Sequence, residues 1–232
     1  MKPEIQEKIS SNNKKISELL RENEALLRQE GYNPPVNNFA LPPTERISFP
    51  PGYIRTVNQF NEKYHLKEIF PQRYSRHNVT YALEVSDLIN YVFNRIHIWG
   101  AVETIFYKLA IVNLVSIIEA LLLETANNIC SKPGSCKQTK KCIKHFNGTE
   151  RANAKAALKK LVFLGVLDFD QKKLERVQDI IDLRNRIHIR LSPGNEMQLD
   201  DFNLQLYNEV ISLLQEIDEQ VYLKGVPLYG CS

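Results

Sequence analysis

The chain has 232 residues, of which 43% are hydrophobic, and a formal net charge of +3. This length suits one domain with an extension or two small domains, and the hydrophobic content is sufficient for a core. The mild positive charge does not by itself indicate binding to nucleic acid. The first eight residues are charged and contain no apolar signal region, so we expect a soluble, cytoplasmic protein.

Residues 1–30 are expected to form an N-terminal helix. Ile and Leu recur among Glu, Lys and Arg in this segment, and Gly31 follows as a stop signal. The apolar stripe is interrupted around Asn12 and Asn13, and the segment offers about three loose heptads. The pattern favours a solvated helix that needs a partner over an independent coiled coil.

Residues 31–52 form the boundary between this helix and the rest of the chain. They contain three Pro-Pro pairs, which favour an extended linker or arm and exclude a regular helix. Residues 53–77 are expected to be a connector with one short helix near 53–64. The connector contains Arg73, Tyr74, Arg76 and His77, which indicate either a solvated surface or an edge that contacts RNA phosphates.

Residues 78–232 are predicted to form an all-α bundle. Apolar residues recur at helical spacing in five segments, 79–96, 102–129, 152–164, 172–188 and 200–222, and no clear strand pattern is visible. The most apolar run, 109–123, is shorter than the roughly 20 residues that a membrane span requires. It also contains Asn113, Ser116 and Glu119, so we expect a buried helix with a polar stripe and no membrane anchor.

An insertion at residues 130–150 contains three of the four cysteines. Cys130, Cys136, Cys142 and His145 are four side chains of the kind that tetrahedral Zn²⁺ binds, but the spacing Cys-x5-Cys-x5-Cys-x2-His is not a standard one. A structural zinc site, inert thiols and disulfides remain alternatives, and a reducing cytosol disfavours the disulfides.

The same insertion is rich in lysine. Its cations either bind RNA by neutralising phosphates or form an ordinary solvated face. The residues expected to contact RNA are Lys137, Lys140, Lys141 and Lys144.

An Arg-Asn pair followed by a His ends the fourth segment of the bundle, as Arg184-Asn185-Arg186-Ile187-His188. Arg184 and His188 are four residues apart and continue the apolar face that Val177 and Ile181 begin. A cation and an imidazole on such a face need a charged partner or a partly wet seam. One interpretation pairs Arg184 with a carboxylate, Asp182 or Glu119, and lets His188 complement the helix dipole. The other is a site that binds phosphate and moves a proton near neutral pH.

These residues resemble the Arg-Asn-x-x-x-His motif of the HEPN superfamily of all-helical domains, over roughly residues 78–222. The chain differs from the usual family spacing, because three residues separate Arg184 from His188 where the family has four to six. The resemblance implies a HEPN-like bundle and a metal-independent endoribonuclease that needs no catalytic cofactor. It also implies a homodimer, a role as a toxin or an anti-phage defence effector, and an antitoxin or a larger complex as partner.

The resemblance assigns chemistry to named residues. His188 is the base or acid that acts on the 2′-hydroxyl of RNA, and Arg184 stabilises the phosphate as charge develops. Asn185 donates a hydrogen bond to the phosphate or holds His188, and Arg186 contacts the RNA backbone or forms an ion pair.

Two further points follow from the same resemblance. Ser116 and Glu119 either position Arg184 or His188, or are satisfied within the bundle. The alternative function is a non-catalytic HEPN-like module that binds RNA or protein within a larger complex, and the shortened Arg–His spacing favours it.

Overall fold

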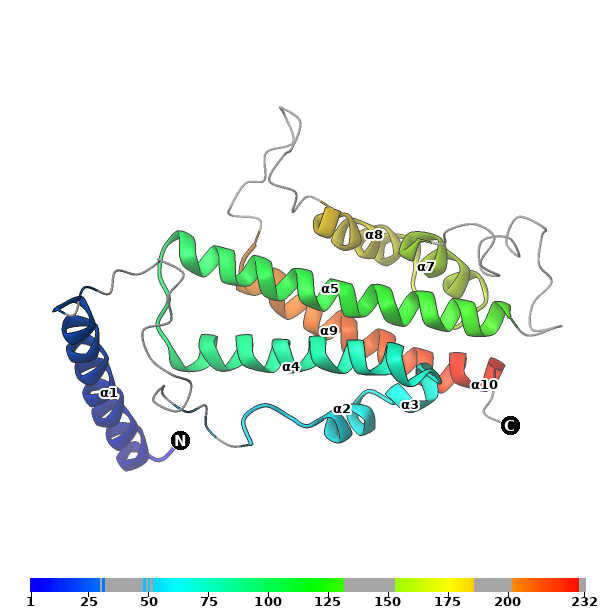
Figure 1. The fold of residues 1–232 in the computed structure, drawn as a ribbon. Helices are drawn as coiled ribbons and strands as arrows, with labels where there is room; N and C mark the ends of the chain where they lie inside the picture. The colour runs from blue at the N-terminus through cyan, green and yellow to red at the C-terminus, as the bar shows by residue number, and fades with distance from the viewer. Residues whose placement is uncertain are drawn as a thin grey trace. The chain divides into compact units, whose positions relative to one another are not determined.

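In the computed structural model, the residues described are 1–29, 31, 48, 50, 52–131, 153–185 and 202–229, and every regular element among them is a helix (Figure 1). The expectation of an all-α protein is confirmed for these residues. The chain divides into two compact units, residues 1–50 and residues 51–232, and each unit is described by itself.

Among the described residues of the first unit there is one helix, α1 (Pro3–Gln29). Glu4 in its first turn and Arg28 in its last turn complement the helix dipole. The helix is continuous through Asn12 and Asn13, and none of its residues is buried. Its Ile and Leu side chains are therefore largely exposed.

The second unit is built around its longest helix, α5 (Ala101–Cys130). This helix packs mainly against α4 (Arg73–Arg95), α7 (Ala154–Phe163), α8 (Gln171–Asn185) and α9 (Leu204–Gln220). Figure 1 shows α7 and α8 on the side of α5 that faces away from α4. Because helices surround α5, its sequence is apolar on nearly all sides, as is typical of a buried helix.

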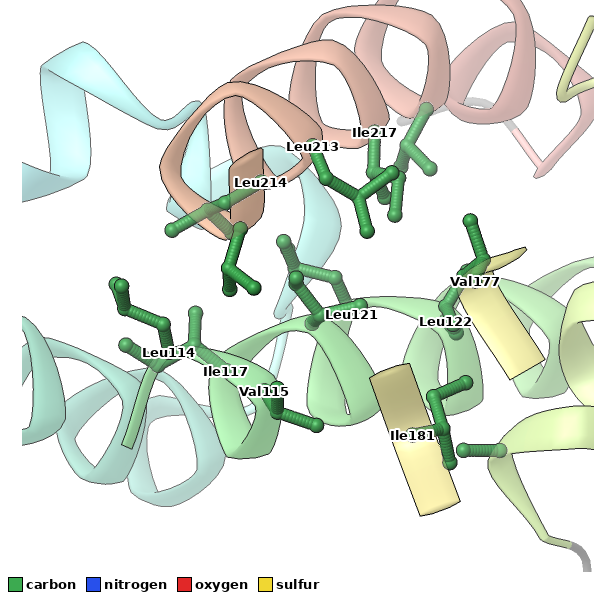
Figure 2. Close-up of a cluster of buried hydrophobic side chains, with 14 of the residues drawn as sticks. Leu114, Val115, Ile117, Leu121, Leu122, Val177, Ile181, Leu213, Leu214 and Ile217 are labelled. Carbon is green, nitrogen blue, oxygen red and sulfur yellow. The ribbon is translucent and has the colours of Figure 1, made fainter. Parts of the chain in front are cut away.

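The core of this unit lies along α5 and joins it to α8 and α9 (Figure 2). Burying each large aliphatic side chain contributes about 1.5–3 kcal/mol, so this layer is the main source of stability. The labelled side chains are Leu114, Val115, Ile117, Leu121 and Leu122 of α5, Val177 and Ile181 of α8, and Leu213, Leu214 and Ile217 of α9.

By length and composition, α5 is the one helix among the described residues that is long and apolar enough to cross a membrane. The core helix of a globular protein passes the same test, and the buried residues of α5 form the centre of this core. The described residues therefore do not form a membrane protein with several spans.

Short helices lie before α4 and after α9. The expected connector contains two of them, α2 (Val57–Lys63) and α3 (Leu66–Ile69). A capping box between Thr56 and Gln59 begins α2, and Phe60 and Leu66 are fully buried. After α9 the chain continues as a π-helix, η3 (Val221–Gly225), and α10 (Val226–Tyr229). Helix α3 of the first group contacts η3 of the second.

A turn at residues 96–100 joins α4 to α5. Gly100 ends it with a φ of 62°, a conformation that glycine adopts without strain. Trp99, the single tryptophan of the chain, is 68% exposed in this turn. The turn is thus fixed by glycine geometry and leaves a large aromatic side chain in solvent.

Candidate functional site

The Arg-Asn pair is located at the end of α8. The apolar face of this helix, with Val177, Ile180 and Ile181, is buried in the core beside α5 (Figure 2). Arg184 and Asn185 are the last two residues of the helix. Position 184 follows Ile181 by three residues and thus continues the same face of the helix.

The remainder of the motif is outside the described residues. It consists of Arg186 and His188 and of the side chains of Arg184 and Asn185. A meeting of Arg184 and His188 over a phosphate accordingly stays a prediction.

Asp182, one of the carboxylates considered as a partner for Arg184, already contacts another helix. Its Oδ2 atom accepts a hydrogen bond from Nζ of Lys155 on α7. Both side chains are more than a third exposed, so this ion pair contributes little to stability. Its effect is local, because it links α7 to the last turn of α8 directly before the Arg-Asn pair.

The polar stripe on α5, formed by Asn113, Ser116 and Glu119, makes different contacts along its length. Asn113 Nδ2 donates to the carbonyl oxygen of Ala82, at 2.7 Å, and to Ser86 Oγ, at 2.8 Å, so it ties α5 to α4. Ser116 Oγ donates to the carbonyl oxygen of Val112 in its own helix, at 2.8 Å. Glu119 is half-buried one turn further along. A role for Ser116 or Glu119 in positioning the Arg–His motif stays a prediction.

Of the expected zinc ligands, the structure describes Cys130, which is buried as the last residue of α5. The described residues contain no cluster of three metal-binding side chains. Zinc binding stays a prediction, as does RNA contact by the lysines, because the other residues of the insertion are outside the described part of the chain. These are Cys136, Cys142, His145, Lys137, Lys140, Lys141 and Lys144.

A pocket of about 740 Å³ was not expected from the sequence. It lies where the end of α4, the turn at 96–100 and the first turns of α5 and α9 meet. Three aromatic rings line it: Phe93 stacks on Tyr107 with centroids 4.5 Å apart, and Tyr207 lies 5.7 Å from Phe93. The volume is within the range of about 300–1,000 Å³ that is usual for ligand pockets.

Polar groups surround these rings. Three amide side chains line the pocket, those of Asn90, Asn94 and Asn208. Burial raises the pKa of Tyr107, and Glu103 beside it adds to the shift. Burial and the neighbouring Tyr107 likewise raise the pKa of Tyr207. Both phenols therefore stay protonated at neutral pH and can donate hydrogen bonds. This pocket could not be predicted from the sequence, since aromatic residues at helical spacing are typical of any core.

A second unexpected feature is an ion pair between α4 and the segment before α2. Arg55 Nε donates to Asp87 Oδ2 at 2.9 Å, and the backbone N–H of Arg55 donates to the same oxygen at 3.0 Å. Burial of Asp87 opposes ionisation, but these hydrogen bonds outweigh it and hold the pKa of Asp87 below its ordinary value. The pair fixes the start of α2 on the bundle.

A third unexpected feature is a histidine–aspartate pair. His65, with a φ of 45°, lies between α2 and α3, and its ring stacks on Tyr222 with centroids 3.6 Å apart. His65 Nδ1 is 3.5 Å from Oδ2 of the buried Asp218 on α9. Burial raises the pKa of Asp218 to about 6, although His65 acts in the opposite direction. Asp218 Oδ1 has no hydrogen-bond partner among the described residues.

Comparison with known proteins found no matching family model, no similar curated protein and no similar solved structure. The residues of this chain are therefore the basis for assigning a function. They offer an Arg-Asn pair at the end of an anchored helix, a pocket with aromatic and amide side chains, and a histidine beside a buried aspartate.

Proposed function

We propose that this chain is a metal-independent endoribonuclease of HEPN type. The position of the Arg-Asn pair carries the proposal, because α8 is anchored in the core by Val177 and Ile181 and ends at Asn185. A rigid helix is a suitable support for a catalytic side chain, which must be held in a fixed geometry. The all-α architecture of the second unit agrees with the helical fold of that family.

The proposed reaction uses only groups of the protein and the RNA. A base takes the proton of a 2′-hydroxyl, and the resulting oxygen attacks the adjacent phosphorus. The bond to the 5′-oxygen breaks, and that oxygen receives a proton from an acid, which leaves a 2′,3′-cyclic phosphate and a 5′-hydroxyl. His188 serves as base or acid, because the pKa of a histidine suits proton transfer near neutral pH. Arg184 binds the charged phosphate with its planar fork of donors, and Asn185 adds a hydrogen bond.

RNA is the proposed partner, and two groups of residues support this. The pocket with Phe93, Tyr107 and Asn208 has the side chains that stack on unpaired bases and bind their edges. The lysines of the insertion and Arg186 would attract the backbone. We further propose a cytoplasmic homodimer in which two motifs share one cleft, acting as a toxin or in defence against phage, with an antitoxin or a larger complex as regulator.

The deciding experiment is cleavage of a mixed RNA pool by the purified full chain with EDTA present. We expect the wild type to cut, and His188→Ala and Arg184→Ala to lose about 10²–10⁴-fold in rate. Lys67→Ala, which removes an exposed cation on α3, is the control and should cut like the wild type. Equal cutting by wild type and His188→Ala would refute this mechanism.

The second candidate is a non-catalytic module that binds RNA or protein within a larger complex. The short spacing between Arg184 and His188 favours it, and the pocket of about 740 Å³ gives it a binding site that needs no catalysis. RNA binding by the wild type without any cutting would support this candidate. Replacing Asn208 with Ala would then weaken binding.

The proposed structural zinc concerns the insertion and not the reaction. Cys130, Cys136, Cys142 and His145 supply the thiolate and imidazole ligands that Zn²⁺ prefers. Elemental analysis of protein purified without chelator should find one zinc per chain, and Cys136→Ser should lower that content. If the protein contains no stoichiometric zinc, inert thiols and disulfides remain as the alternatives for these cysteines.

A further inference from the structure

The exposed side of α1 carries a regular apolar seam. Its positions alternate at spacings of four and three residues along one continuous helix of 27 residues. Its Ile and Leu members are 44–59% exposed, although such side chains are stabilised by burial. The seam comprises Ile5, Ile9, Asn12, Ile16, Leu19, Asn23 and Leu26.

This repeat indicates what kind of surface covers the seam. A strict seven-residue repeat keeps a seam in register with a second helix that supercoils around the first. In heptad terms Ile9 and Ile16 occupy a positions, and Leu19 and Leu26 occupy d positions. Such a repeat of a and d positions forms the seam along which one helix packs against another. The partner is therefore expected to be one helix of similar length.

The polar members of the seam exclude other partners. Asn12 and Asn23 would be left without hydrogen bonds in a lipid surface or an apolar groove, which is costly. A second copy of the helix brings asparagine against asparagine, and such a pair fixes the register. Helix α1 also has equal numbers of acidic and basic residues, whereas a helix that lies on an anionic membrane is rich in Lys and Arg.

We propose that α1 pairs with α1 of a second copy of this chain as an antiparallel two-stranded coiled coil along this seam. In a parallel pair Lys15 would face Leu20, and Glu22 would face Leu27, so no opposite charges would meet. In the antiparallel pair Asn12 lies opposite Asn23, and Ile16 lies opposite Leu19. This alignment also places Lys15 beside Glu22 of the second copy, twice by symmetry.

The pairing is tested by sedimentation equilibrium of the full chain. Leu19→Gln removes an apolar side chain from two layers of the seam at once, so we expect self-association to weaken by roughly tenfold or more. Glu18→Gln, a neighbouring change off the seam, is the matched control and should associate like the wild type. If the second unit also self-associates, the difference in dissociation constant between these two variants still isolates the contribution of α1.

Two results would overturn the pairing. One is a wild-type chain that stays monomeric at roughly 100 μM. The other is a dissociation constant for Leu19→Gln that matches that of Glu18→Gln. Both results are independent of RNA cleavage, so the failure of this proposal and that of the proposed function are separable.

The orientation is tested by exchanging charges. Lys15→Glu should weaken association by placing like charges together, and the double variant Lys15→Glu/Glu22→Lys should restore it. Lys14→Glu makes the same charge change on the outer side of α1 and should have little effect. If the Lys15→Glu variant associates as tightly as the Lys14→Glu variant, the antiparallel arrangement is wrong.

Discussion

Two buried aspartates of the second unit respond to their surroundings in opposite ways. Asp87 receives hydrogen bonds from the guanidinium and the backbone of Arg55, which lower its pKa. Asp218 is buried, has one oxygen without a hydrogen bond among the described residues and has a raised pKa. Burial opposes ionisation of both carboxyls, and the hydrogen bonds from Arg55 outweigh it at Asp87, whereas burial prevails at Asp218.

For Asp218 we expect stability to fall as the pH rises. The pKa is 3.8 ordinarily and about 6 in the folded chain, so the folded state binds the proton more tightly between these values. Stability from this group is complete below about pH 4 and is lost by about pH 6. Asp218→Asn should therefore be more stable than the wild type at pH 7.5, by up to about 3 kcal/mol, and nearly equal to it at pH 4. Urea unfolding at both pH values measures this difference, and equal stabilities at pH 7.5 would contradict it.

For Asp87 we expect the opposite, that stability falls as the pH is lowered. Its folded pKa lies below the ordinary 3.8, so its contribution is present above that value and is lost as the pH falls through the folded pKa. Asp87→Asn leaves Arg55 without its charged partner and should cost about 1–3 kcal/mol at pH 7. Thermal unfolding at pH 7 and at acid pH should show the cost shrinking as the wild-type carboxyl becomes protonated. A cost that is unchanged by pH would contradict this account.

At the scale of elements, α5 supports the other helices of its unit. Leu122 is fully buried between α5 and α8, so Leu122→Ala should lower the free energy of unfolding by about 2–5 kcal/mol. Leu109 on the same helix is 54% exposed, and Leu109→Ala should change it by less than about 0.5 kcal/mol. Chemical denaturation of both variants makes the comparison. Similar losses in the two would mean that α5 is not the centre of the core.

The helices that the sequence predicted best are the ones with the longest apolar periodicity. The expected ends of α5 and α9 lie within a few residues of the observed ones, because many buried positions recur along them. Helix α3 has four residues, which is too short to produce a period, and it was missed. The pocket near Tyr107 and the pair of His65 with Asp218 were also missed, because each forms only when segments far apart in the sequence pack together.

At the scale of the whole molecule, the two units should be separable. Every buried residue that the structure describes belongs to the second unit, and none lies in α1. A chain of residues 51–232 should therefore unfold within about 2 °C of the full chain, since it keeps all of these buried residues. It should also lose the association that α1 provides. Calorimetry and sedimentation check the two parts of this prediction, and a large drop in the unfolding temperature would contradict it.

The position of Trp99 has a practical consequence. The chain has this one tryptophan, and it is exposed in the same turn whose Ile96, His97 and Ile98 line the pocket. An indole in water emits at longer wavelength than one that is covered. Tryptophan fluorescence therefore comes from a single site beside the pocket, and a blue shift on titration would report a ligand that covers this turn without any dye or label.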